Sequence, residues 1–450
     1  MRSRRDFLSL LGMAVGATLS GCGGSENAAS GGFAAAGSGS SPALTPTAYR
    51  YLPLTAAGQK LAGDIKALPR VEDGFPAFPG GVQLNDQRHV FFHALDEGEV
   101  RGIYRIDVNG TGTPSQVSKI IREGDRLPDG TTVGDFTDGC VNNSDDFVLG
   151  ISDSQGAESI QCSLSGGGFQ SQVRCYKDYS AQAKFAGELS RVQSISDDGR
   201  VLFVGEYFDQ DGLASGDGLF VMPVGRPELA ELVLAHEQLI PGTSAVIQCF
   251  THVQLCNGGR YLAQGTASSS RGQSSLNGDG KPMTFLLTGR IGEAPQALAV
   301  DPALGTAGRG YQLATCYTCA RMTPDSVAMV LQPDSDTTQL WLNQTKLLEA
   351  SLDGGSLSPR GSKIVSFLPP VFGPSGLLYF QVFTQSGMEL ILHNGSRAIT
   401  LLAKGDQLLG KEVETILFGT QTEGVNAQGD FVTILEFSDG EVGVFLAVPV

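Results

Sequence analysis

One pattern of apolar and polar positions recurs along the chain. Each copy opens with an apolar residue, continues through a short run of polar and small residues, and ends where apolar residues alternate with others. The seven copies are LNDQRHVFF from Leu84, VNNSDDFVL from Val141, ISDDGRVLF from Ile195, LCNGGRYLA from Leu255, MTPDSVAMV from Met322, FGPSGLLYF from Phe372 and VNAQGDFVT from Val425. We call this pattern the repeat motif and number its nine positions from the opening apolar residue.

The composition of the motif predicts a tight turn between two strands. Its first and seventh positions are apolar in all seven copies, and its fifth position is glycine in four of them. Glycine tolerates the positive φ that tight hairpins require, and Asn or Ser side chains hydrogen-bond to nearby backbone groups. We therefore expect one strand to end at the first position and a second strand to leave the turn with period-two alternation.

Each repeat contains further segments that alternate like strands. RGIYRID follows HVFFHAL, and MELILHN follows LLYFQVF. A later segment such as SKIIREGD or AITLLAKGD completes the unit, and no amphipathic helix pattern separates these segments. Four strands in a unit that repeats every 50 to 67 residues predict an all-β fold, a seven-bladed β-propeller of four-stranded antiparallel blades.

The last repeat lacks a fourth strand before the chain ends at Val450. The N-terminal segment YLPLTAAGQKLAG, from Tyr51, is similar to the fourth-strand segment ITLLAKGDQLLG, from Ile399, and no repeat precedes it. We expect residues around 49 to 56 to complete the last blade, because this arrangement leaves no open edge strand. The propeller domain is therefore placed at residues 47–450.

The repeat motif resembles bacterial β-propeller repeats of the form Asn-x-x-Gly-x-Val-x-Phe, found in exported lipoproteins of unknown function. The turn in ISDDGRVLF also resembles the Ser-Pro-Asp-Gly turn of TolB-type propellers. The likeness covers about residues 49–450 and implies an architecture rather than a chemistry. Some copies depart from it: Cys256, Thr323 and Gly373 replace Asn or Ser, and Asp145 and Ser326 replace Gly.

The N-terminus, MRSRRDFLSLLGMAVGATLSGC, has the features of an export signal. Its apolar stretch is too short to span a bilayer as a helix, and the paired Arg4 and Arg5 before it resemble a Tat signal. LSGC resembles a lipoprotein lipobox, which implies a signal peptide at residues 1–21 and lipidation of Cys22. Residues 22–46 then form a Gly-, Ser- and Ala-rich flexible linker. We expect a membrane-anchored protein of the bacterial cell envelope, at the periplasmic side of the outer membrane or at the cell surface.

The charge of the chain limits its partners. The formal net charge is −16, and no basic cluster offsets it. Such a surface repels nucleic acid. We expect a monomer that meets an envelope protein or a glycan.

Seven cysteines follow Cys22, so at least one of them is free or intermolecular. Cys162 and Cys175 lie in ESIQCSL and SQVRCYK, two consecutive strands of one expected blade. Antiparallel pairing could place them opposite each other, at a separation that suits a disulfide in an oxidising envelope. Two unpaired strand cysteines are the alternative interpretation.

Motifs that carry chemistry are sparse. The sequence contains no Gly-x-Ser-x-Gly elbow, phosphate-binding loop or dinucleotide glycine motif. The loops DQDGLASGDG and NGDGK hold weak calcium candidates, namely Asp209, Asp211, Asp217, Asn277 and Asp279. The closing glutamate of an EF-hand is absent, and Asp and Gly are ordinary loop residues. We expect no cofactor, with Ca²⁺ as the alternative.

These observations favour a binding or scaffold module over an enzyme. The alternative is an envelope hydrolase or lyase whose site lies at the channel mouth and takes one residue from each blade. Rigid scaffolds usually present binding residues on variable loops. We therefore expect the functional surface opposite the motif turns, on the loops 96–100, 209–218 and 268–281 and the blade connections 124–130 and 405–411. Neutral insertion is the alternative interpretation of these loops.

Overall fold

The computed structural model describes residues 46–450 except 47, 70–76, 80, 138, 165–168, 175–184, 209–213, 272, 277–281, 302–303, 305–310, 313–318, 324, 334–335, 344 and 419–423. No helix within this described part is long and apolar enough to cross a membrane.

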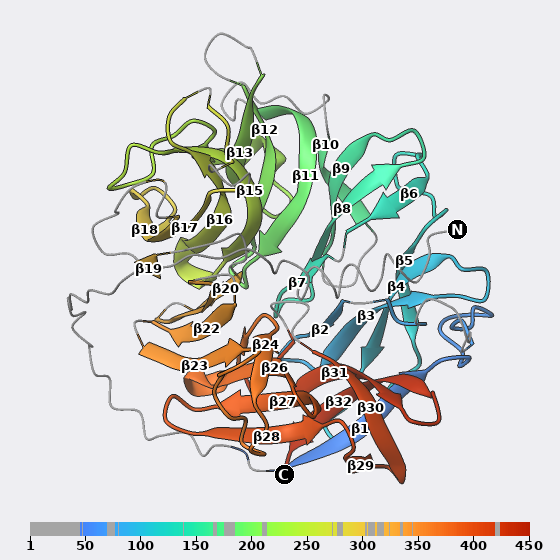
Figure 1. Ribbon diagram of the computed structural model, residues 1–450. Coiled ribbons are helices and arrows are strands. Elements are labelled where there is room, and N and C mark those ends of the chain that lie inside the picture. Colours follow the sequence, from blue (N-terminus) through green and yellow to red (C-terminus); the bar gives the residue numbers. More distant parts are fainter. Residues whose placement is uncertain are drawn as a thin grey trace.

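Strands form seven small sheets arranged in a ring, each a blade (Figure 1). Blade 1 contains β2 (Val82–Leu84), β3 (His89–Leu95), β4 (Arg101–Asp107) and β5 (Ser118–Arg122). Blade 2 contains β6 (Val133–Phe136), β7 (Cys140–Val141), β8 (Phe147–Asp153), β9 (Glu158–Ser163) and β10 (Phe169–Arg174). Blade 3 contains β11 (Phe185–Ile195), β12 (Arg200–Phe208), β13 (Ala214–Pro223) and β14 (Glu231–Ala235). Blade 4 contains β15 (Val246–Leu255), β16 (Arg260–Ser268), β17 (Thr284–Arg290), β18 (Gln296–Val300) and β19 (Tyr311–Gln312).

The other three blades follow the same plan. Blade 5 contains β20 (Cys319–Met322), β21 (Val327–Leu331), β22 (Thr337–Leu342) and β23 (Thr345–Ser351). Blade 6 contains β24 (Ile364–Phe367), β25 (Val371–Phe372), β26 (Leu378–Thr384), β27 (Gly387–His393) and β28 (Ala398–Ala403). Blade 7 contains β1 (Tyr49–Ala56), β29 (Gln407–Leu408), β30 (Lys411–Leu417), β31 (Phe431–Phe437) and β32 (Val442–Pro449). The described residues also form the single-turn 3₁₀ helices η1 (Pro227–Leu229), η2 (Asn257–Gly259) and η4 (Pro374–Gly376).

The prediction of seven four-stranded antiparallel blades is confirmed, and the protein is a seven-bladed β-propeller. In each blade the strands follow one another from the centre of the ring outward, as in the order β2-β3-β4-β5. In blades 2 and 6 the innermost strand consists of two short segments. Strands β6 and β7 both pair with β8, and strands β24 and β25 both pair with β26. The short β19 adds a parallel partner at the outer edge of blade 4.

The closure of the ring by the N-terminal segment is also confirmed. Strand β1 pairs antiparallel with β32, from Tyr49 opposite Pro449 to Ala56 opposite Gly443. It is thus the outermost strand of blade 7, next to the strand that ends the chain. The seam between blades 7 and 1 is held further by Arg88, whose Nε lies 2.7 Å from Oδ2 of Asp430.

The apolar core lies between the blades. Within the described residues there are seven hydrophobic clusters, and each joins two neighbouring blades. Strand β12 shows the cause: Leu202 and Val204 pack toward blade 4, whereas Val201 and Phe203 pack toward blade 2. Successive side chains of a strand point to opposite faces, so a central strand must be apolar at every position to fill both interfaces.

The path of each blade decides where its turns lie. The first strand of every blade runs into a motif turn, so all seven motif turns meet at one end of the ring, which we call the motif face. The loops between second and third strands and the connections between blades lie at the other end, which we call the loop face. Strand β16, from Arg260 to Ser268, separates the two faces by about 25 Å at the usual rise per residue.

Candidate functional site

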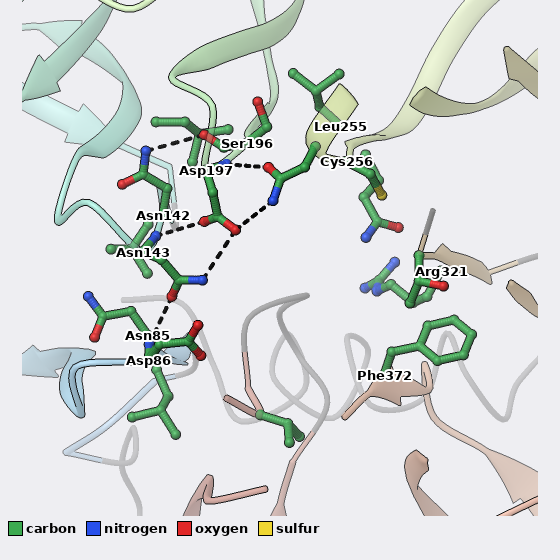
Figure 2. A pocket seen from close by; sticks show the side chains of 17 residues that line it. Asn85, Asp86, Asn142, Asn143, Ser196, Asp197, Leu255, Cys256, Arg321 and Phe372 are labelled. Atoms are coloured by element: carbon green, nitrogen blue, oxygen red, sulfur yellow. Dashed lines mark hydrogen bonds between the residues drawn. The ribbon is translucent and has the colours of Figure 1, made fainter. Parts of the chain in front are cut away.

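Residues from all seven motif turns line a pocket of about 250 Å³ at the centre of the motif face (Figure 2). Its apolar lining comes from first motif positions, namely Leu84, Val141, Ile195, Leu255, Phe372 and Val425. Its polar lining is Asn85, Asp86, Asn142, Asn143, Ser196, Asp197, Gln254, Cys256, Asn257, Arg321 and Thr323. The pocket therefore occupies the mouth of the channel around which the blades are arranged.

Where the second motif position is Asn, in blades 1, 2 and 7, its side chain holds the turn in shape. In blade 7, Oδ1 of Asn426 accepts the backbone N–H groups of Gln428 at 3.1 Å and of Asp430 at 2.9 Å. Asn142 binds the equivalent two N–H groups in blade 2, both at 2.9 Å. Such side-chain-to-backbone bonds replace partners that the turn backbone would otherwise lack. The Asn of the motif is therefore a structural residue of the turn.

The fifth motif position takes the left-handed backbone conformation. Its φ is 74° at Gly199 and 82° at Gly429, as the glycine pattern predicts. Arg88 and Asp145 adopt it too, with φ of 63° and 65°. Side chains other than glycine seldom accept this conformation. Both side chains bind a neighbouring blade: Arg88 pairs with Asp430, and Asp145 lies 2.6 Å from Nδ1 of His89 and 3.5 Å from Nη2 of Arg105. These contacts give the side chain at each position a structural role.

The third motif positions form a chain of hydrogen bonds from turn to turn. The N–H of Ala427 donates to Oδ1 of Asp86 at 2.7 Å, and the N–H of Asp86 donates to Oδ1 of Asn143 at 2.8 Å. The N–H of Asn143 then donates to Oδ1 of Asp197, and the N–H of Asp197 to Oδ1 of Asn257, both at 2.8 Å. Five turns, from blade 7 through blades 1, 2 and 3 to blade 4, are thus linked around the mouth (Figure 2 shows the central part).

The sequence explains why this chain of bonds stops. The third motif position is proline in blades 5 and 6, at Pro324 and Pro374, and proline has neither a side-chain oxygen to accept a bond nor an N–H to donate one. Ala427 donates but has no side-chain oxygen to accept. The wall of the pocket beside blades 5 and 6 consequently differs from the rest, and it carries Arg321 and Phe372.

Arg321 brings a positive charge to this wall. It lies on β20, directly before the repeat motif of blade 5, and its side chain faces the pocket (Figure 2). Although charged, Arg321 is only 7 % exposed. Its Nη1 donates to Nε2 of His252, on β15 of blade 4, at 2.8 Å. Burial, and then the proximity of Arg321, lower the pKa of His252 to about 3, so the imidazole accepts this bond in its neutral form.

The candidate residues named from sequence lie elsewhere or outside the described residues. Cys22, Asp209, Asp211, Asn277 and Asp279 lie outside them. Asp217, the remaining calcium candidate, lies on β13 and does not line the pocket. Its Oδ2 accepts the backbone N–H of Phe250 at 3.3 Å, and burial raises the pKa of its carboxyl group. Within the described residues no group of three or more His, Cys, Asp or Glu is placed to hold a metal ion.

The expected disulfide gains no support from the strand register. Cys162, on β9, is a buried free thiol that lies opposite Gln170 of β10. The ladder continues to Arg174, which lies opposite Ser159, and Cys175 lies outside the described residues. Burial, followed by the charge of Asp146, raises the pKa of the Cys162 thiol to about 12. The pairing of Cys162 with Cys175 stays a prediction.

The pocket lies on the face opposite to the one expected from sequence. The sequence-based expectation placed the functional surface on the variable loops, because the seven motif turns are short and similar. Part of that loop surface, including residues 209–213 and 277–281, lies outside the described residues. A signal for the pocket was present in the third motif position, where Asp86, Asn143, Asp197 and Asn257 are polar.

Comparison with known proteins places the chain by its fold. No protein family matches it, and no curated protein sequence matches it. Solved structures similar to it include the β-propeller domain of the Trilobed protease from Pyrococcus furiosus, at 8 % identity and a TM-score of 0.45, covering 82 % of this chain and 92 % of that one. The BP39L lectin from Burkholderia pseudomallei matches at 9 % identity and a TM-score of 0.39, covering 82 % and 98 %. A putative TolB from Agrobacterium tumefaciens matches at 11 % identity and a TM-score of 0.33, covering 82 % and 90 %.

These likenesses concern the propeller fold alone, and none of them assigns a ligand to this chain. The class of protein follows from the chain's own strand pairing: it is a β-propeller closed by its N-terminal strand, with a polar pocket at the motif face.

Proposed function

We propose that this protein is a lipid-anchored binding module of the bacterial cell envelope whose ligand enters the pocket on the motif face. The observation that carries the proposal is the convergence of all seven motif turns on one pocket. The hydrogen bonds between turns hold its polar groups in fixed positions before any ligand arrives, and preorganisation of this kind lowers the cost of binding. A pocket of about 250 Å³ admits a small molecule or the end of a peptide or glycan chain.

The N-terminal strand supports an anchor on the same face as the pocket. Tyr49, the first residue of β1, has its hydroxyl 2.9 Å from that of Tyr379. Gly429 of the blade 7 motif turn packs close to the same Tyr379 and to Pro449. Strand β1 therefore starts at the motif face, and the linker that precedes it in the sequence joins the propeller there. With Cys22 lipidated, the pocket would lie on the side of the propeller that is tethered to the membrane.

The anchor is tested by the location of the protein in cells. Wild-type protein should be recovered in the membrane fraction, whereas Cys22→Ala should be recovered in the soluble envelope fraction or retain its signal peptide. Equal membrane recovery of both proteins, each with a processed N-terminus, would contradict the anchor. The pocket proposal does not depend on this result.

The pocket is tested with a purified fragment of residues 47–450 and a library of amino acids, dipeptides, monosaccharides, disaccharides and organic acids. A ligand that binds the folded protein raises its melting temperature. Asn257→Trp places an indole at an exposed position of the pocket lining and should abolish the shift. Gln155→Trp, in the exposed turn between β8 and β9 on the loop face, is the matched control and should retain it. The proposal fails if no compound shifts melting, or if Asn257→Trp leaves every shift unchanged.

A further inference from the structure

The pocket carries opposite charges on opposite walls. Arg321 and Phe372 lie on one side of the opening, and Asp86 and Asp197 lie across from them (Figure 2). The formal charge of the lining residues is thus one positive and two negative. Charges placed in this way suit a small ligand that carries both signs of charge.

The positive wall matches a carboxylate. The guanidinium of Arg321 keeps its charge next to a neutral imidazole, because His252 accepts from it through an unprotonated nitrogen. A guanidinium presents its N–H donors as a planar fork that fits the two oxygens of a carboxylate. A phosphate also fits such a fork, but its second negative charge would be repelled by Asp86, by Asp197 and by a chain of formal charge −16.

The negative wall offers an acceptor for a cationic donor. Both carboxylate oxygens of Asp197 already accept hydrogen bonds from the adjacent turns, with Asn143 on Oδ1 and Asn257 on Oδ2. Asp86 uses Oδ1 to accept the N–H of Ala427, and no described residue donates to its Oδ2. Its carboxylate points toward the centre of the pocket (Figure 2), where a protonated amine could reach it.

The size and lining of the pocket limit the rest of the ligand. At about 250 Å³ it is smaller than the sites that enclose drug-sized molecules. Apolar side chains at first motif positions, such as Leu255 and the half-buried Phe372, also line the pocket. The ligand is accordingly small, and part of it is apolar.

We propose that the pocket binds a free α-amino acid with an apolar side chain, whose carboxylate pairs with Arg321 and whose ammonium group binds Asp86. Such a zwitterion has no net charge, so the acidic surface does not repel it. This inference rests on the proposed function, because it names the ligand class of the same pocket.

Isothermal titration of residues 47–450 with three related compounds tests the inference. L-leucine carries both charges, L-leucinamide lacks the carboxylate, and N-acetyl-L-leucine lacks the ammonium group. L-leucine should bind at least about tenfold more tightly than either analogue, because each analogue lacks one of the two charged groups that contact the pocket. Arg321→Gln should remove the preference over L-leucinamide, and Asp86→Asn should remove the preference over N-acetyl-L-leucine.

A matched control removes a charge from the other face. Glu97→Gln, at an exposed position between β3 and β4, should leave all three affinities unchanged. If Arg321→Gln does not fold, Asp86→Asn and Arg321→Lys are used in its place. Arg321→Lys keeps the positive charge but removes the planar pair of N–H donors, so it should weaken L-leucine binding. Asn at position 86 can still accept the N–H of Ala427, so this variant keeps the bond between turns.

Two results would overturn the inference and leave the proposed function standing. One is equal affinity for the three leucine compounds. The other is binding of an uncharged library member, such as N-acetylglucosamine, when L-leucine does not bind. Loss of that binding in Asn257→Trp would show that the uncharged compound occupies the pocket. Absence of any ligand for the pocket would overturn both proposals.

Discussion

Single side chains decide the shape of the motif turns. Asn426 is 4 % exposed, and besides its two backbone bonds its Nδ2 donates to Oδ2 of Asp430 at 2.8 Å. Asp430 in turn pairs with Arg88 of blade 1. One amide thus organises the last motif turn and holds a carboxylate that links two blades.

We expect Asn426→Ala to lower the free energy of unfolding by about 2 kcal/mol, because it leaves the buried N–H of Asp430 and the part-buried N–H of Gln428 without their acceptor. Urea unfolding followed by circular dichroism measures the change. Gln428→Ala, an exposed side chain of the same turn, is the control and should change stability by less than about 0.5 kcal/mol. Equal effects of the two substitutions would show that the Asn side chain does not hold the turn.

The neutral state of His252 makes stability depend on pH. Its pKa is about 3 in the folded protein and near 6.5 when unfolded. The unfolded chain therefore takes up a proton that the folded protein does not, and stability falls as the pH decreases below 6.5. Between pH 7 and pH 5 this residue should cost up to about 2 kcal/mol.

His252→Gln removes the titrating group and still offers an oxygen to Arg321. Its free energy of unfolding should change less between pH 7 and pH 5 than that of the wild type. Parallel pH curves for the two proteins would contradict a buried neutral histidine at this position.

At the scale of elements, the strand that closes the ring is the one most separated in sequence from its partner. Strand β1 pairs along its length with β32 and covers the outer edge of blade 7. Leu52 and Leu54 also pack against the cluster that joins blades 7 and 1. Removal of β1 would expose both an unpaired edge and apolar surface.

Deletion of residues 47–60 from the 47–450 fragment should therefore cause aggregation and lower the melting temperature. Light scattering and thermal unfolding measure the two effects, with the complete 47–450 fragment as the reference. A truncated protein that stays monomeric and melts at the same temperature would show that the ring does not need its N-terminal strand.

At the scale of the whole molecule, the two faces of the propeller have different constructions. The motif face consists of short turns bonded to one another around a pocket, whereas the loop face carries the longer loops. Strands of seven to nine residues separate them, so a change in one face should leave the other intact.

Replacement of residues 268–281 by a short Gly–Ser turn should preserve folding and ligand binding at the pocket. The melting temperature and the shift produced by a pocket ligand measure this. The sequence-based expectation of a binding surface on the loop face makes the opposite prediction, namely loss of the envelope partner in a pull-down. Loss of small-ligand binding after this replacement would transfer the site to the loop face.

Local patterns along the chain are sufficient to specify the architecture. Turn chemistry and period-two alternation act between residues close together in the chain, so seven motifs, their strands and the closing segment at residues 49–56 could all be recognised. The left-handed conformation at Arg88 and Asp145 could not be recognised in this way, because the side-chain contacts that accompany it involve Asp430 and His89, which belong to neighbouring blades.

The position of the candidate site depends instead on how distant blades come together. Asp86 and Arg321 belong to blades 1 and 5, and they face one pocket because the ring closes and brings every first strand to the same axis. The bonds from Ala427 to Asp86 and from Asp86 to Asn143 likewise join residues that the sequence separates by whole blades. A local pattern specifies each turn, but the chemistry of the mouth depends on the order and spacing of seven turns around a closed ring.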